Sequence, residues 1–281
     1  MTTMTFDGRA FQRAFGHQPM LVAHDLWAEP LLALTAIGSL ATELAPEDVH
    51  HHLGDLPKLM LDGDPPRLEA TPAEIAHSIE TNNCRLSLRF IQQVPRYCEL
   101  MNLVLDRVEP LVGDREGGMQ RRESFLFVSA PSVVVPLHAD PEHNFLLQVR
   151  GTKKVRVGNF DDPSVFDADL ERQYLGGRGY LRTMPDSFTD FVLKPGDGLY
   201  LPPHAPHLVE NADETCIAFS VTFYTPATDR VRVLYRFNGY VRKLGLSPHR
   251  PGEIARLDRA KLAAIKTWTR AKRLARRIRG D

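Results

Sequence analysis

The segment from residue 122 to residue 226 most constrains the fold, because it is a series of short apolar runs separated by turn residues. The runs are rich in β-branched and aromatic residues and are bounded by Gly, Pro or Asp, which is typical of strands. They read SFLFVSA, SVVVPLH, NFLLQVR, KKVRV, DFVLK, GLYLP and TCIAFSVTFYT. Strands at this spacing favour a sandwich or barrel, with a jelly-roll double sheet as the natural candidate. One longer connection, residues 158–189, is expected to be functional or locally helical.

The regions on either side show apolar residues at helical spacing, so the predicted fold is mainly β with flanking helices. Residues 1–121 are predicted to form a helical region with a few strands that pack on the core. Residues 122–226 are predicted to form the core, and residues 227–281 a basic helical appendage. Within the first region, Thr71 and Glu74 form a capping box that predicts the start of a helix, and NNCRLSLRFIQQ has the two-residue period of a strand.

Charge is distributed unevenly along the chain, although its net charge is zero. Residues 229–281 contain 16 Lys and Arg against 4 Asp and Glu, a net charge of +12, so the remainder carries −12. We predict a homodimer formed through the C-terminal helices, with nucleic-acid binding by the basic tail as the weaker alternative. An apolar stripe on the last helix favours packing; it consists of Ile254, Leu257, Ile265, Trp268 and Ile278.

The chain shows no sign of a membrane or secretory segment. No apolar run reaches the length needed to cross a bilayer, and the first residues lack the apolar stretch of a signal peptide. The three cysteines, Cys84, Cys98 and Cys216, are isolated, which argues against a disulfide framework and a CxxC zinc site. A reducing, cytoplasmic location is therefore expected.

Polar residues follow one of the predicted core strands directly, and they are candidate metal ligands. His138 and Asp140 are two apart, and residues two apart on a strand point to the same face. A third ligand is expected from PGDGLYLPPHAPHLVEN, in which Gly196, Pro202, His207 and Asn211 match the spacing of the second cupin motif, G-x5-P-x-G-x2-H-x3-N. His204 replaces the second glycine of that motif. We choose His207 as the ligand, because it occupies the motif's ligand position.

Two histidines and one carboxylate on one face of a metal, with open positions opposite, are the facial triad of non-haem Fe(II) oxygenases. A structural zinc site would close the fourth position and favour cysteine, and no cysteine lies near either motif. His138, Asp140 and His207 are therefore the predicted metal ligands and catalytic centre.

These stretches resemble the JmjC-like, cupin-type oxygenases that use Fe(II) and 2-oxoglutarate. The sequence is most similar to the bacterial cupin-like members and to protein hydroxylases related to the factor-inhibiting-HIF asparaginyl hydroxylase. The resemblance covers residues 122–226 and rests on HAD, NFLLQVRGTK, PGDGLYLPPHAPHLVEN and AFSVTFYT. It implies a double-stranded β-helix core and the hydroxylation of an unactivated C–H bond. The implied substrate is a protein side chain or a small molecule derived from an amino acid.

The resemblance also implies a cosubstrate site. Lys153 matches the lysine that binds the distal carboxylate of 2-oxoglutarate, with Lys154 as the competitor for that role. Asn144 matches an asparagine near the cosubstrate, and Thr222 stands where a polar contact is expected. Val135 departs from the family, since relatives often have a threonine there.

Weaker expectations complete the prediction. Tyr174, Arg178 and Tyr180 lie in a predicted lid and are candidate substrate contacts. The run His50–His52 is expected in a surface loop. The alternatives in function are a cupin-like binding or regulatory protein without turnover, and a cupin that holds another divalent metal and no oxo acid.

Overall fold

The structure is a computed structural model that describes residues 4–61 and 65–279, with side chains described up to residue 267. These residues fall into two compact units. The sheet unit comprises the chain up to residue 161 together with residues 180–225, and the helical unit comprises residues 162–179 and the chain from residue 226 onward. The predicted division of the chain at residues 121 and 226 stays a prediction.

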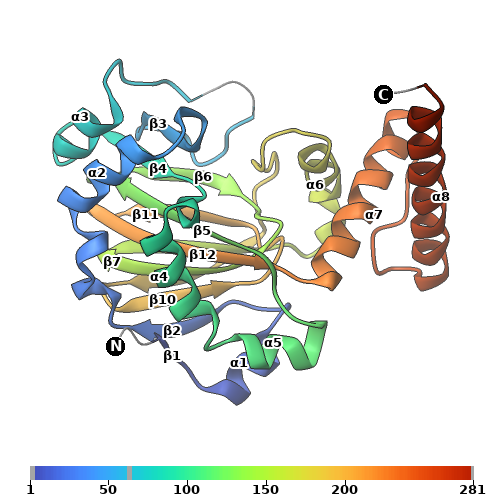
Figure 1. Ribbon diagram of the computed structural model, residues 1–281, viewed down its shortest axis with the longest axis horizontal. Coiled ribbons are helices and arrows are strands. Elements are labelled where there is room, and N and C mark those ends of the chain that lie inside the picture. Colours follow the sequence, from blue (N-terminus) through green and yellow to red (C-terminus); the bar gives the residue numbers. More distant parts are fainter. Residues whose placement is uncertain (1–3, 62–64, 280–281) are drawn as a thin grey trace. The chain divides into compact units, whose positions relative to one another are not determined.

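The sheet unit is built on two antiparallel sheets (Figure 1). The larger has the strand order β1–β2–β10–β7–β12–β5–β4–β3, and the smaller has the order β6–β11–β8–β9. The larger sheet consists of β1 (Met4–Thr5), β2 (Met20–His24), β10 (Asp197–Leu201), β7 (His143–Arg150), β12 (Cys216–Tyr224), β5 (Gln120–Ser129), β4 (Cys84–Leu88) and β3 (Val49–Leu53). The smaller sheet consists of β6 (Val134–His138), β11 (His207–Asn211), β8 (Lys153–Asn159) and β9 (Ser187–Leu193). The predicted mainly β fold with flanking helices is confirmed.

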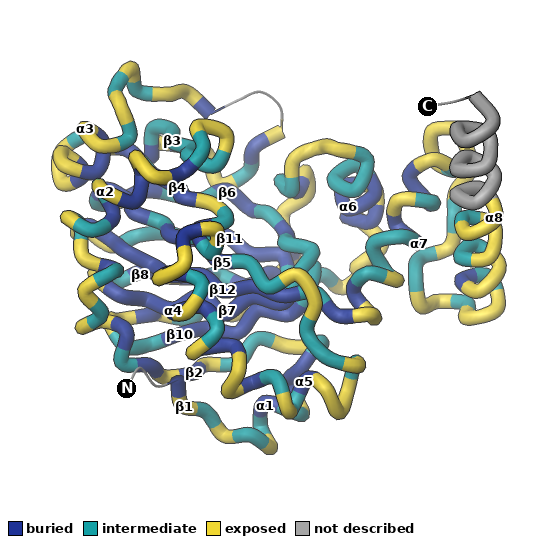
Figure 2. Tube along the Cα trace, in the orientation of Figure 1, coloured by how far each residue is buried: buried dark blue, intermediate teal, exposed yellow. Residues whose placement is uncertain are grey.

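Alternation along the strands gives the larger sheet two different faces. In β5, Leu126 and Val128 belong to the main apolar core, whereas Phe127 packs on a second cluster between the sheets. The partner of Phe127 on β12 is Ala218, which belongs to the same second cluster as Val155 on β8. Because successive side chains on a strand point to opposite faces, the register fixes which residues line the space between the sheets. Figure 2 shows that these strands are largely buried.

Helices of the N-terminal region cover the outer face of the larger sheet, where their apolar residues join the main core. They are α1 (Gly8–Ala14), α2 (Leu34–Glu43), α3 (Pro72–His77), α4 (Pro95–Leu105) and α5 (Glu109–Glu116), with short 3-10 turns at Leu26–Ala28, Pro30–Leu32, Pro46–Asp48 and Ile91–Gln93. The capping box predicted at the start of α3 is confirmed, since the Thr71 side chain accepts from the Glu74 amide and the Glu74 side chain accepts from the Thr71 amide.

The histidine run was predicted in a surface loop, and this prediction is wrong. His50–His52 lie in β3, which pairs with β4 in an antiparallel register. β3 ends the strand order of the larger sheet, and all five of its residues are half-buried. An edge strand accepts polar side chains that a central strand would exclude, so the apolar pattern that identifies buried strands is missing here.

The helical unit contains a 3-10 turn at Pro163–Phe166 and three helices: α6 (Asp167–Tyr174), α7 (Pro226–Lys243) and α8 (Ala255–Arg279). The long connection is therefore locally helical, as predicted. Buried acids pair with the C-terminal segment, since Glu171 binds Arg242 and Asp167 accepts from Tyr235 at 3.0 Å. No helix in the described residues is long and apolar enough to cross a membrane.

Candidate functional site

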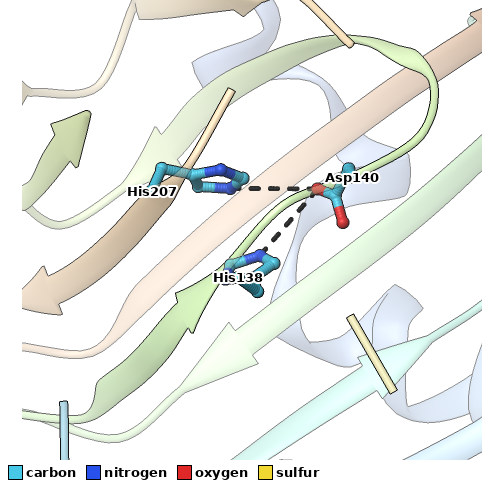
Figure 3. A group of neighbouring side chains, drawn as sticks. All are labelled: His138, Asp140 and His207. Atoms are coloured by element: carbon cyan, nitrogen blue, oxygen red, sulfur yellow. Dashed lines mark ion pairs between the residues drawn. The ribbon is translucent and has the colours of Figure 1, made fainter. Parts of the chain in front are cut away.

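Three side chains predicted as metal ligands converge at one end of the space between the sheets (Figure 3). The Nε2 atoms of His138 and His207 each lie 3.8 Å from Oδ2 of Asp140. The two imidazole centroids are 4.1 Å apart. His207 is almost fully buried, whereas a third of the Asp140 side chain is exposed, so the group is open on its carboxylate side.

The strands position the two histidines, and main-chain carbonyls orient their rings. His138 ends β6, His207 begins β11, and the two residues are direct partners in the antiparallel register. Nδ1 of His138 lies 2.8 Å from the Pro136 carbonyl, and Nδ1 of His207 lies 2.9 Å from the Ala205 carbonyl. A carbonyl accepts only from a protonated nitrogen, so in the neutral form of each ring Nε2 carries the lone pair and is available to a ligand in the shared space.

Asp140 reaches the site for a different reason from the one predicted. It lies just beyond the end of β6, so it shares no strand face with His138. Its backbone carbonyl instead accepts a hydrogen bond of 2.7 Å from the amide of His204, in the turn that precedes β11. His204 has φ +62°, the left-handed conformation in which glycine is ordinary. A histidine here keeps the backbone geometry of the motif's missing glycine, which explains the departure at this position.

Burial and charge set the protonation of the groups around this end. Burial, with a smaller contribution from the neighbouring His138, lowers the pKa of His207 to about 4 against the raising effect of Asp140. A neutral imidazole is the form that binds a metal. Burial and the charge of Asp140 raise the pKa of Glu142 to about 8, and Tyr224 donates to this carboxyl at 3.1 Å.

The two candidate lysines on β8 face opposite ways. Lys153 is 5% exposed and faces the space between the sheets, on the same side as Val155 and Asn211. Lys154 is half-exposed and lies 3.8 Å from Asp190 on β9. Burial lowers the pKa of Lys153 to about 8. Only Lys153 can therefore serve a ligand held between the sheets.

A glycine turn places Lys153. Gly151 joins β7 to β8 with φ +72°, and a Cβ there would lie 2.4 Å from the carbonyl oxygen of Thr215. No side chain fits at this position, so the turn is tight and Lys153 begins β8 immediately after it. The sequence spacing from Gly151 to Lys153 thus has a structural cause.

The other predicted cosubstrate contacts also line the space between the sheets. Asn144 on β7 and Thr222 on β12 are register partners, and both are buried. Asn144 accepts a hydrogen bond of 2.7 Å from Ser220. The Thr222 hydroxyl is buried and has no hydrogen-bond partner among the described residues. A buried hydroxyl without a hydrogen bond destabilises the folded state, which favours a ligand that accepts from it.

The three candidate substrate contacts belong to different units. Tyr180 belongs to the sheet unit and forms a β-bridge with His138, which places it next to the metal ligands. Tyr174 and Arg178 belong to the helical unit, where Tyr174 stacks on Tyr235 with ring centroids 6.0 Å apart. A role of these residues in substrate binding stays a prediction.

One charged residue in this space was missed from the sequence. Arg85 lies on β4, and its guanidinium carbon is 4.6 Å from the ring centroid of Phe127. Burial lowers the pKa of Arg85, while Tyr180 and Asp140 raise it. The alternation of Arg85 and Ser87 with Leu86 and Leu88 was the signal that could have found it.

Comparison with known proteins shows which proteins the core is similar to. Residues 118–231 match the JmjC domain. The Jumonji C domain-containing protein 5 of Drosophila melanogaster is 26% identical over 141 residues, which cover 47% of this chain and 31% of that protein. The chain therefore spans about a third of the length of this curated relative. The predicted resemblance to JmjC-like proteins is confirmed.

Solved structures agree with the fold. The ribosomal oxygenase YcfD of Escherichia coli superposes with a TM-score of 0.54 at 20% identity, covering 95% of this chain and 68% of that one. YcfD in complex with cobalt and 2-oxoglutarate gives a TM-score of 0.56 at 20% identity, and covers 96% of this chain and 68% of that one. A further YcfD structure contains cobalt and succinic acid, with a TM-score of 0.55 at 22% identity over 96% of this chain and 68% of that one.

Proposed function

We propose, from the match of residues 118–231 to the JmjC domain, that this protein is an Fe(II)- and 2-oxoglutarate-dependent oxygenase. The observation that carries the proposal is the convergence of His138, Asp140 and His207 at one end of the space between the sheets, with Lys153 facing the same space. A divalent cation and a dicarboxylic oxo acid are the ligands that this set of groups suits.

The donor set fits iron. Two neutral imidazole nitrogens and one carboxylate oxygen face a common point, and the exposed side of Asp140 leaves room for further ligands. Bound Fe(II) would supply the activation of O2 that hydroxylates an unreactive C–H bond, with 2-oxoglutarate decarboxylated to succinate.

The protein's own residues orient the metal ligands and bind the cosubstrate. The carbonyls of Pro136 and Ala205 hold the two imidazoles in the tautomer that presents Nε2. Lys153 binds the distal carboxylate of the oxo acid, because a buried carboxylate needs a cationic partner. Thr222 donates its unpaired hydroxyl to the cosubstrate, and Asn144 lies beside it in the register. Burial of this space keeps water from competing for these contacts.

The proposed substrate is a protein side chain or a small molecule derived from an amino acid, and the reaction is hydroxylation. The structural neighbour YcfD is described as a ribosomal oxygenase, which makes ribosomal proteins the first candidates. A cytoplasmic location fits this choice, and the free thiols of Cys84, Cys98 and Cys216 fit a reducing compartment.

The proposal is tested by offering ribosomal proteins and free amino acids to the iron-loaded protein with 2-oxoglutarate and oxygen-18 gas. We expect one substrate to gain a single labelled oxygen atom by mass spectrometry, with one succinate formed per oxygen. The Asp140→Ala variant is the control and should label nothing. A loss of a methyl group in place of a gain of oxygen would contradict hydroxylation as the final outcome.

We further propose a homodimer formed through the C-terminal helices. The end of α7 and the residues after it expose large apolar side chains, with Leu244 78% and Leu246 60% exposed. In the predicted stripe, Ile254, Leu257 and Ile265 are half-buried, and Trp268 and Ile278 lie outside the residues whose side chains are described. Exposed apolar groups of this size are typical of a surface that a partner covers.

Deletion of residues 251–281 should lower the oligomeric mass measured by light scattering, because it removes one side of the proposed interface. The deletion also uncovers the side of α7 that packs on α8. Apolar surface returned to water costs roughly 25 cal/mol per Å2, so the variant should also be less soluble. A deletion variant that keeps its mass and stability but loses salt-sensitive RNA binding would instead support the nucleic-acid role of the tail.

A further inference from the structure

Arg85 faces the space between the sheets from a strand that lies outside the JmjC match. β4 pairs with β5, so that Arg85 is opposite Ser129, and Ser129 is opposite Cys216 on β12. Partners in an antiparallel register point to the same face of the sheet. Arg85, Ser129 and Cys216 therefore form one row across three strands, on the inner face that also carries Phe127 and Ala218.

Lys153 meets this row from the opposite sheet. The Cys216 thiol lies 3.3 Å from the carbonyl oxygen of Thr152, the residue before Lys153. Lys153 and Cys216 interact electrostatically, and the positive charge of Arg85 helps to lower the pKa of Lys153. Two cations, one from each sheet, thus approach the same part of the interior.

Among the described residues, no ion pair links a carboxylate to Lys153 or Arg85. The charge of Asp140 acts on Arg85 without forming such a pair. The guanidinium of Arg85 stacks on Phe127, a contact that holds it in place without neutralising it. Asn211 lies opposite Lys153 in the register, and its buried Nδ2 also has no hydrogen-bond partner. The buried charge of Lys153, the like charge of the half-buried Arg85 and the spare buried donor of Asn211 are costly to bring together unless an anion joins them.

Arg85 is positioned to contact a ligand that extends from the metal ligands to Lys153. Its charge interacts with Asp140 at one end and with Lys153 at the other. The row through Ser129 and Cys216 places the backbone of Arg85 near the Lys153 end of the space between the sheets. Val135 on β6, a position without a hydroxyl, packs on the same inner cluster. Arg85 can supply from β4 the donors that this position on β6 lacks.

We propose that Arg85 and Lys153 together bind the distal carboxylate of the oxo acid, so that Arg85 is a specificity-determining residue for a dicarboxylic cosubstrate. This inference rests on the proposed function. It assigns the planar guanidinium to a two-point contact with the carboxylate, and the Lys153 ammonium to a single contact at its other edge.

The test compares two oxo acids by calorimetry, with Mn2+-loaded protein so that no turnover occurs. 2-oxoglutarate has the distal carboxylate, and 2-oxopentanoate has the same chain length without it. We expect Arg85→Met to weaken 2-oxoglutarate binding by about tenfold or more, the effect of removing a charge-assisted contact. Binding of 2-oxopentanoate should be unchanged, and Arg85→Lys should restore part of the lost affinity.

The matched control is Arg89→Met. Arg89 is the exposed residue that follows β4, and its guanidinium carbon lies 5.2 Å from the ring centroid of Phe90. The Arg89→Met substitution removes the same charge outside the space between the sheets and should leave both affinities unchanged. Circular dichroism and thermal unfolding of Arg85→Met, compared with those of the control, show whether the fold is retained.

The outcomes separate this inference from the proposed function. A folded Arg85→Met protein with unchanged 2-oxoglutarate affinity, or with equal losses for both oxo acids, overturns the assignment of Arg85 to the distal carboxylate. A wild-type protein that binds Mn2+ but neither oxo acid overturns the proposed function, and this inference with it. A loss confined to 2-oxoglutarate supports both.

Discussion

Replacing His138 or Asp140 by alanine should abolish Fe(II) binding and 2-oxoglutarate turnover and leave a folded protein. Each replacement leaves two of the three ligand atoms that lie within 4.8 Å of one another, too few to hold the ion against water. Both side chains are partly exposed, so their removal opens no large cavity in the core. Atomic spectroscopy measures the iron content of each variant, and circular dichroism shows whether the fold is retained.

The same experiment decides between the two histidines of the second motif. His207→Ala should lose the metal as completely as the other ligand variants. His204→Ala is the matched control and should bind metal almost normally, because the amide of residue 204 still donates to the Asp140 carbonyl. His204→Gly should be milder still, since glycine adopts φ +62° without strain. The reverse order of effects would assign the ligand role to His204.

Lys153→Ala should raise the KM for 2-oxoglutarate by about ten- to a hundredfold, because it removes a charge-assisted contact worth roughly 1.5–3 kcal/mol. Lys154→Ala is the control on the same strand. Its ammonium is half-exposed and lies near Asp190, so its loss should leave the KM unchanged. Steady-state kinetics with varied 2-oxoglutarate check both variants, and a large effect from Lys154 alone would transfer the role to that residue.

The same lysine predicts the direction of a pH effect. Burial lowers its pKa to about 8 in the absence of ligand. A carboxylate binds the protonated ammonium, so affinity for 2-oxoglutarate should be full below pH 8 and fall as the pH rises through that value. Calorimetry across this range should show the fall in the wild type and not in Lys153→Ala. Affinity that stays constant above pH 8 in the wild type would contradict the assignment.

The strands of the core could be predicted from the sequence because their apolar periodicity is local. The strand at Cys84–Leu88 was expected for the same reason, but its place beside β5 was not. That place depends on pairing between segments about 40 residues apart, which no local pattern encodes. Arg85 was missed for this reason, since only the register shows that it faces the space between the sheets.

The metal ligands could be predicted because two motifs at a fixed separation specify them, even though the reasoning for Asp140 was incomplete. A shared strand face was assumed, and the structure uses a turn held by the His204 amide instead. The membership of residues 162–179 in the helical unit could not be predicted either. It depends on ion pairs such as that of Glu171 with Arg242, which join residues 71 positions apart.

The most direct test of the account is the conversion of 2-oxoglutarate to succinate by the iron-loaded protein in the presence of O2 and without added substrate. We predict slow succinate formation that requires Fe(II) and is lost in Asp140→Ala. A protein that binds one Fe(II) and one 2-oxoglutarate per chain, yet forms no succinate above the level of Asp140→Ala, would contradict an oxygenase. Such a result would instead support a cupin-like binding protein.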